Sequence, residues 1–185
     1  MLLHERGIEI SHETVRFWWD RFGPLFAAEI RRKRVQQLRA HSNRQWHLDE
    51  VFVKINGETH YLWRAVDHEG EVLESYVTKR RDRKTALKFI RKSMKRFGKP
   101  KVIGNVHRQE TGRWLNNRVE NSHLPFRRRE RAMLRFRRMR SLQKFVAVHA
   151  SVYNLFNSER SLYSRSNFKL NCAAALAEWR QLGAA

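Results

Sequence analysis

The sequence contains one cysteine, few acidic residues and no long apolar run. Cys172 alone excludes an intrachain disulfide framework and a multi-cysteine zinc site, and the nine histidines show no metal-ligand spacing. Any bound metal should therefore be held by carboxylates. No apolar stretch approaches the roughly 18 residues that span a membrane, and no signal peptide opens the chain. These absences favour a cytoplasmic protein with no membrane partner.

Positive charge dominates the composition. The 185 residues include 39 Lys and Arg against 18 Asp and Glu, which gives a formal net charge of +21. Such a chain repels itself unless it binds a polyanion, so nucleic acid is the leading partner and a nucleoid-associated location is expected. The length suits one domain with a short additional N-terminal module.

Residues 46–55 are the segment on which the rest of the prediction depends, and Asn56 and Gly57 follow them directly. Apolar and β-branched residues predict a strand here, and Asn-Gly predicts a two-residue type I′ hairpin turn. Asp49 and Glu50 lie inside this strand, where successive side chains alternate between faces, so one acid must point at a core face or a cleft. It is either a capping or salt-bridged acid at a strand end, or a metal-binding aspartate on a central strand.

The N-terminal residues predict two short helices. Residues 1–7 are typical of the end of a helix, and Ser11 is a suitable cap for a second helix that carries Arg16 and Arg21 off its apolar face. Together they match a helix-turn-helix, whose second helix enters the DNA major groove, although an ordinary amphipathic helical hairpin fits as well. Gly23 and Pro24 should close this module at residues 1–25, and residues 26–44 should form a basic connecting helix.

Two further strands are predicted at residues 58–67 and 72–78, which complete a three-stranded antiparallel meander. Residues 84–97 predict a helix laid across this sheet, with an apolar stripe formed by Leu87, Ile90, Met94 and Phe97. The opposite face of the helix is basic with almost no acids to balance it, which indicates phosphate contact. Its residues are Lys88, Arg91, Lys92, Lys95 and Arg96.

Residues 101–103 are too few to support a strand, and Gly104-Asn105 interrupts them. Helix resumes at residue 113, where Asn116, Glu120 and His123 share one face at i, i+4, i+7 spacing. A polar stripe on a helix that must pack is a candidate site.

The last third of the chain is basic and then apolar. Residues 126–144 carry nine Lys or Arg against one acid, Glu130, and residues 142–156 present an apolar face that includes His149, interpreted as a core histidine. A final Ala-rich helix is predicted to begin after Asn171 and to run to Leu182. The predicted DNA contacts in the basic segment are Arg127, Arg128, Arg129, Arg131, Arg135 and Arg138.

Four motifs resemble the IS-six family of bacterial insertion-sequence transposases: WHLDEVFVKING at residues 46–57, YLWRAVD at 61–67, NNRVENSH at 116–123 and RRRERAM at 127–133. The resemblance covers nearly the whole chain. It implies an α+β/α/β fold with an RNase H-like (ribonuclease H-like) integrase core at residues 45–160, a partial N-terminal helix-turn-helix, and a C-terminal tail and helix at 161–185. It also implies DNA cutting and joining at the terminal inverted repeats of an insertion sequence, with Mg²⁺ as the usual cofactor and a homo-oligomer or a hetero-oligomer with an intact transposase as the assembly.

The resemblance further implies a catalytic Asp-Asp-Glu set. Asp49 matches the first acid and Glu120 the third, as catalytic residues and metal ligands, while Asn116 and His123 would support them. Three carboxylates are needed because two divalent ions must be held a few ångströms apart. The middle aspartate normally ends the fourth strand, but no aspartate follows Asp82, and the segment near residues 103–104 is absent.

Three functions remain open at this stage. The first is an active transposase in which Glu110 replaces the missing acid, because it is the single acid between Asp82 and Glu120. The second is a remnant that binds DNA without catalysis and interferes with an intact transposase. The third, a basic RNA-binding protein, lacks any RNA-module motif. The missing aspartate favours the second.

Overall fold

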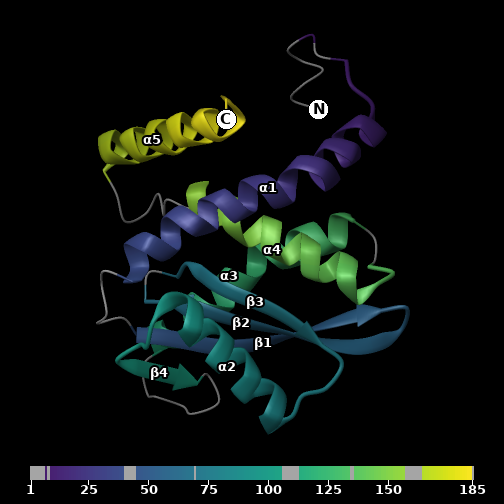
Figure 1. Ribbon diagram of the computed structural model, residues 1–185, viewed down its shortest axis with the longest axis vertical. Helices are drawn as coiled ribbons and strands as arrows, with labels where there is room; N and C mark the ends of the chain where they lie inside the picture. Colours follow the sequence, from purple (N-terminus) through teal and green to yellow (C-terminus); the bar gives the residue numbers. More distant parts are fainter. Residues whose placement is uncertain are drawn as a thin grey trace.

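The computed structural model describes residues 7, 9–39, 45–68, 70–105, 113–133, 136–156 and 164–184, and in these ranges it leaves out the side chains of residues 37–39, 104–105, 113–122 and 183–184. A four-stranded sheet of order β3-β2-β1-β4 lies in the lower half of the view, with most of the helices above it (Figure 1). Its strands are β1 (Gln45–Ile55), β2 (Glu58–Asp67), β3 (Val72–Thr78) and β4 (Val102–Asn105). The helices are α1 (His12–Arg39), α2 (Arg83–Phe97), α3 (Arg113–Ala132), α4 (Met139–Phe156) and α5 (Arg165–Ala184).

The predicted antiparallel meander is confirmed. Asn56 and Gly57 both have positive φ, 51° and 85°, as a type I′ turn requires, and they pair Ile55 with Glu58. The expectation that Gly104-Asn105 interrupts the fourth strand is wrong. β4 extends through both residues because it pairs in parallel with β1, from Gln45↔Val102 to Leu48↔Asn105. Pairing with β1 thus makes a strand of a segment that is too short to be predicted as a strand from its own sequence.

Each face of the sheet packs against different helices. Trp46, Trp63, Ala65 and Leu73 form one core with Phe89 and Phe97 of α2. On the other face, β1 and β2 residues pack against α3 and α4; this core contains Val51, Val53, Ile55, Leu62, Phe126, Phe136, Leu142 and Val146. Alternation along β1 therefore sends odd-numbered side chains toward α3 and α4 and even-numbered ones toward α2.

Helix α2 lies across the sheet as predicted, but the residues that it buries differ in part from the predicted apolar stripe. Asp82 caps it by accepting a hydrogen bond from Thr85 N at 2.7 Å, and Gly98, with φ 88°, ends it. Phe89, Ser93 and Phe97 are its buried residues, whereas Leu87, predicted in the stripe, is 40% exposed. The strongly apolar positions of this helix thus do not all fall on the face that meets the sheet.

The predicted helix end at Gly23 and Pro24 is wrong, because α1 runs through both residues. A proline inside a helix cannot donate to the carbonyl four residues earlier, here that of Asp20. Lys144 Nζ of α4 donates to this carbonyl at 2.8 Å and to Asp20 Oδ1 at 2.9 Å. A Cβ on Gly23 would lie only 3.2 Å from Val148 Cγ1, so the glycine lets α1 approach α4 closely. The proposed boundary between residues 25 and 26 therefore falls inside one helix.

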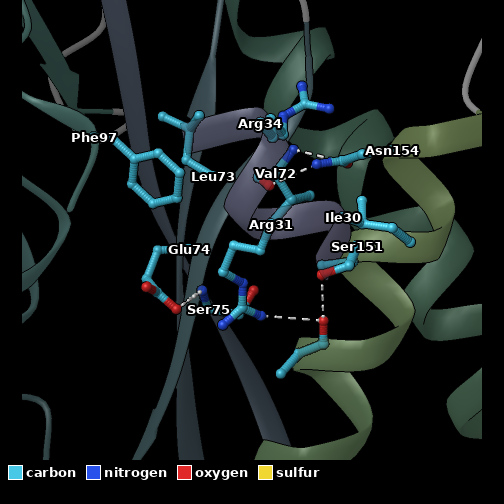
Figure 2. Close-up of a pocket in the computed structure, with 12 residues that line it drawn as sticks. Ile30, Arg31, Arg34, Val72, Leu73, Glu74, Ser75, Phe97, Ser151 and Asn154 are labelled. Carbon is cyan, nitrogen blue, oxygen red and sulfur yellow. Dashed lines mark hydrogen bonds between the residues drawn. The ribbon is translucent and has the colours of Figure 1, made fainter. Parts of the chain in front are cut away.

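Side chains of α4 hydrogen-bond to β3, one of the two edge strands of the sheet. Asn154 accepts from Val72 N at 3.1 Å and donates to Val72 O at 2.7 Å, and Gln143 makes the same pair of contacts with Val77 N and Ser75 O. Figure 2 shows Asn154 facing Val72. These amides replace a neighbouring strand, so β3 is covered rather than left open for pairing.

Helix α1 lies on the outer side of α4, and α5 lies farther out (Figure 1). Arg31 donates to Ala147 O at 3.3 Å, and Arg34 pairs with Glu71. α5 contacts α1 through Phe26 and Trp179, whose ring centroids are 5.5 Å apart. Its predicted start after Asn171 is wrong, since it begins at Arg165. Over the described residues, no helix is long and apolar enough to cross a membrane.

Candidate functional site

Asp49 lies on β1 and faces the side of the sheet covered by α3 and α4. In the antiparallel register it pairs with Arg64 of β2, a residue only 4% exposed. Asp49 Oδ1 accepts a hydrogen bond from Glu50 N at 2.8 Å. Burial lowers the pKa of Arg64 to about 10, while Asp49 and Tyr153 act in the opposite direction, so the guanidinium remains charged at neutral pH. The central acid of the predicted site therefore lies beside a buried cation.

Glu50 occupies the opposite face of the strand. It forms an ion pair with Arg81, and its side chain is 8% exposed. Of the two adjacent acids, Glu50 is thus the one that forms a salt bridge, the first of the two roles expected from the sequence. Asp49 is the one that faces α3.

His123 of α3 reaches this same face. Its Nε2 lies 3.2 Å from Asp49 Oδ2, yet this buried nitrogen makes no hydrogen bond within the described part of the chain. Burial, followed by the positive charges of Arg64 and Arg127, lowers the pKa of His123 to about 3. The ring is therefore neutral at physiological pH, and its short contact with Asp49 is not an ion pair.

The remaining predicted members of the site are described only in part. Asn116 and Glu120 belong to α3, but their side chains lie outside the described residues, as does Glu110 altogether. Glu120 precedes His123 by three positions, a spacing that shares one helix face. The last described pair of β4 with β1 joins Asn105 and Leu48, next to Asp49.

Comparison with known proteins decides the family. The DDE domain pattern matches residues 43–108 and 101–159, more than half of the chain. The chain belongs to the IS-six family of DDE transposases. The transposase of the insertion sequence-like element IS431mec of Staphylococcus aureus is 34% identical over 102 residues, which cover 55% of this chain and 43% of that protein. The transposase of IS257 in transposon Tn4003, also from Staphylococcus aureus, is 33% identical over the same lengths.

The chain therefore spans less than half the length of these two transposases. An uncharacterised protein of Yersinia pseudotuberculosis is 35% identical over 61 residues, 31% of this chain and 57% of that protein. No solved structure matches the chain. A DDE domain implies an RNase H-like fold, and the mixed sheet with helices on both faces agrees with it.

Members of the DDE family usually use a divalent metal. Over the described residues, no group of three His, Cys, Asp or Glu is placed to hold an ion. Asp49 and His123 together offer a carboxylate and a buried imidazole nitrogen at 3.2 Å. Two donors suit one cation at most, and they do not suit the pair of ions that the family's chemistry uses.

Most of the basic residues predicted to contact DNA are exposed. Lys92 lies over the Tyr76 ring at 4.8 Å, and Arg21 lies 5.9 Å from the Phe17 and Phe22 rings. The exposed members are Arg16, Arg21, Lys88, Arg91, Lys92, Lys95, Arg128, Arg129, Arg131 and Arg138.

Three basic residues stand apart from this exposed set. Arg127 is engaged within the chain, donating to Glu130 Oε2 and Phe52 O, each at 2.6 Å. Arg96 was expected on the outer face of α2, but it turns toward the sheet and pairs with Glu74. Arg135 lies outside the described residues.

Arg64 is the site residue that the sequence analysis did not identify. The sequence could have predicted its position, because a two-residue turn at Asn56-Gly57 fixes the register of the hairpin. This register places residue 64 opposite residue 49. A buried arginine directly opposite an acid would then have been expected to pair with it.

Proposed function

We propose that this DDE transposase chain binds DNA but does not cut or join it. The single observation that carries the proposal is the edge of the sheet beside Asp49. The described part of β4 runs beside β1 as far as the pair of Asn105 with Leu48, next to Asp49, and no aspartate occurs anywhere after Asp82. The position where the family supplies its middle acid therefore has no aspartate.

The charges around Asp49 support the loss of two-metal chemistry. The charged guanidinium of Arg64 opposes the negative charge of Asp49, and the neutral ring of His123 adds no charge. Asp49, Arg64 and His123 together therefore carry no net charge. Two Mg²⁺ ions bring four positive charges and keep several waters even in good sites, so they need more anionic oxygen than these residues provide. The two separate matches to the DDE pattern, which overlap at residues 101–108, also support an internal shortening there.

DNA binding is proposed from the distribution of exposed charge. Helix α2 contains no acidic residue, and the Lys and Arg side chains on its outer face are exposed. The end of α3 adds Arg128, Arg129 and Arg131. Phosphate contacts dominate the affinity of such surfaces, so binding does not require the catalytic acids.

The N-terminal part is proposed as a reduced DNA-reading module. The first half of α1 presents Arg16 and Arg21 at its surface, and Ser11 caps it by accepting from Thr14 N at 3.1 Å. The rest of the helix-turn-helix falls on residues outside the described part. Inhibition of an intact relative, by occupying its DNA ends or joining its oligomer, is the role that such a chain would have.

A gel-shift titration on a linear DNA duplex tests the proposal. Affinity should fall steeply between 50 and 200 mM salt, by roughly tenfold or more, because several phosphate contacts release counterions. A K88E/R91E/K92E variant should bind much more weakly, whereas Lys33→Glu, on α1 beside Glu178, is the matched control and should bind nearly as well as the parent. Flat salt dependence, or no binding at 50 mM salt, would refute DNA binding.

A further inference from the structure

We propose that the first half of α1 is a dimerisation surface, on which a second copy of this chain packs its own α1 as an antiparallel helix. The surface consists of Val15, Trp18, Phe22 and Leu25, called here the α1 stripe. The inference goes beyond DNA binding and does not depend on it.

The four residues of the α1 stripe are apolar and exposed. Their exposed fractions are 44% for Val15, 47% for Trp18, 39% for Phe22 and 64% for Leu25. They follow one another at intervals of three, four and three residues, which places them on one side of the helix. This is the spacing of the apolar positions through which two helices pack in a coiled coil. A helix is therefore the partner that the stripe fits.

Within the described part of the chain, α4 and α5 pack against other parts of α1. Helix α4 contacts a neighbouring side of α1, where the ring centroids of Trp19 and Phe145 lie 6.1 Å apart. Helix α5 contacts α1 at Phe26, and the first turns of α1 extend past the C-terminal end of α5 (Figure 1). Val15 and Trp18 belong to these first turns, which accounts for their exposure.

A cavity between α1 and α5 continues the stripe. It has a volume of about 620 Å³, and its apolar lining consists of Phe22, Leu25, Phe26 and Leu182. A parallel partner helix would run into α5 beyond this cavity, whereas an antiparallel helix passes along the first turns of α1. An antiparallel pair centred between Trp18 and Phe22 places Val15 opposite Leu25 of the second copy. The stripe is then its own complement, as an interface with two-fold symmetry requires.

The charge of this segment permits a second copy to approach. The chain carries a formal charge of +21, so two copies repel each other over most of their surface. Residues 9–25 differ, because Glu9, Glu13 and Asp20 oppose Arg16 and Arg21. A dimer that is built on this segment therefore brings almost no net charge together at its centre.

The apolar area of the stripe suits a weak dimer. At these exposed fractions the stripe presents roughly 400 Å² per copy, and an apolar patch of this size often marks a protein contact. With the flanking turns, the pair should bury about 1,200 Å² in total, which is the lower end for specific interfaces. We therefore expect a dissociation constant of about 1–100 µM.

Analytical ultracentrifugation of the nuclease-treated whole chain, over concentrations that bracket this constant, tests the inference. Dimerisation should strengthen as salt is raised, because salt screens the repulsion between the copies and leaves the apolar contact in place. Trp18→Glu should weaken it by roughly tenfold or more, since it puts a charge into an apolar contact. Leu170→Glu is the matched control and should leave it unchanged, because this leucine of α5 is 67% exposed and lies outside the stripe.

Cysteine cross-linking tests the antiparallel arrangement. In a Cys172→Ser background, Val15→Cys combined with Leu25→Cys should give a disulfide-linked dimer. The two positions lie about 15 Å apart on one helix, so they cannot pair within one chain. Val15→Cys alone should stay uncross-linked, and a dimer linked through it would contradict the antiparallel pair.

A chain that stays monomeric at every concentration would overturn the inference, as would equal effects of Trp18→Glu and Leu170→Glu on dimerisation. A monomer that Trp18→Glu destabilises more than Leu170→Glu would show that a segment of the same chain covers the stripe. Gel shifts on the same samples at low salt separate the two proposals. DNA binding by a chain that does not dimerise refutes only this inference, whereas a dimer that does not bind DNA refutes only the proposed function.

Discussion

Asn154 of α4 hydrogen-bonds to both backbone groups of Val72, accepting from its N–H at 3.1 Å and donating to its carbonyl at 2.7 Å. One amide side chain therefore replaces a neighbouring strand at the edge of the sheet. The contact connects α4, which also packs against α1, to the strand farthest from β4.

Asn154→Ala should lower the free energy of unfolding by about 2–4 kcal/mol, because it leaves a buried N–H and a buried carbonyl without partners. Urea denaturation measures the change. Asn171→Ala, at an exposed position of α5, is the matched control and should change stability by less than about 0.5 kcal/mol. Equal effects of the two substitutions would contradict the edge-covering role.

Acid should destabilise the protein partly through His149. Burial, followed by Arg64 and Arg129, lowers the pKa of this histidine to about 4, and its ring stacks on Tyr153 with centroids 5.9 Å apart. The unfolded chain takes up a proton near pH 6.5 and the folded chain only near pH 4, so the contribution is present above pH 6.5 and lost as pH falls toward 4.

Between pH 7 and pH 4.5, the parent should therefore lose about 1–3 kcal/mol more stability than His149→Phe, which keeps the ring contacts but cannot titrate. Urea unfolding at the two pH values gives both differences. An identical loss in parent and variant would show that His149 titrates alike in the folded and unfolded chains.

Sequence preference in DNA binding should be weak. The first half of α1 exposes Phe17 and Trp18, at 57% and 47%, between its arginines, and the other basic surfaces are suited to phosphates. In a competition assay, inverted-repeat ends of an insertion sequence should outcompete random duplex by less than tenfold, about 1.4 kcal/mol. A larger preference for the inverted-repeat ends would contradict this prediction and indicate that the helix-turn-helix is a complete recognition module.

Local signals were enough to predict the centre of the fold. Asn56 and Gly57 define the first hairpin, and period-two alternation defines the strands beside it, because both depend only on neighbouring residues. Asp49 was identified on the same basis. The register that follows from this turn also places Arg64 opposite Asp49.

Long-range contacts account for what the sequence did not predict. Pro24 predicted a helix end because proline cannot donate a hydrogen bond to the Asp20 carbonyl. In the structure Lys144, 120 positions after Pro24, donates to this carbonyl instead. β4 depends on β1, and the orientation of His123 toward Asp49 depends on how α3 packs against the sheet. The position of β4 and the orientation of His123 do not follow from the spacing of residues along the sequence.

The most direct test of the central claim is a cleavage and strand-transfer assay on DNA carrying inverted-repeat ends, with Mg²⁺ or Mn²⁺. The unmodified chain should give no product, because Asp49 and Glu120 lack the third carboxylate that two-metal chemistry needs. Activity should return when the missing strand-end segment with its aspartate is reinserted after Ile103. Products from the unmodified chain that disappear with Asp49→Ala, Glu120→Ala and Glu110→Ala would contradict the account and identify Glu110 as the replacement ligand.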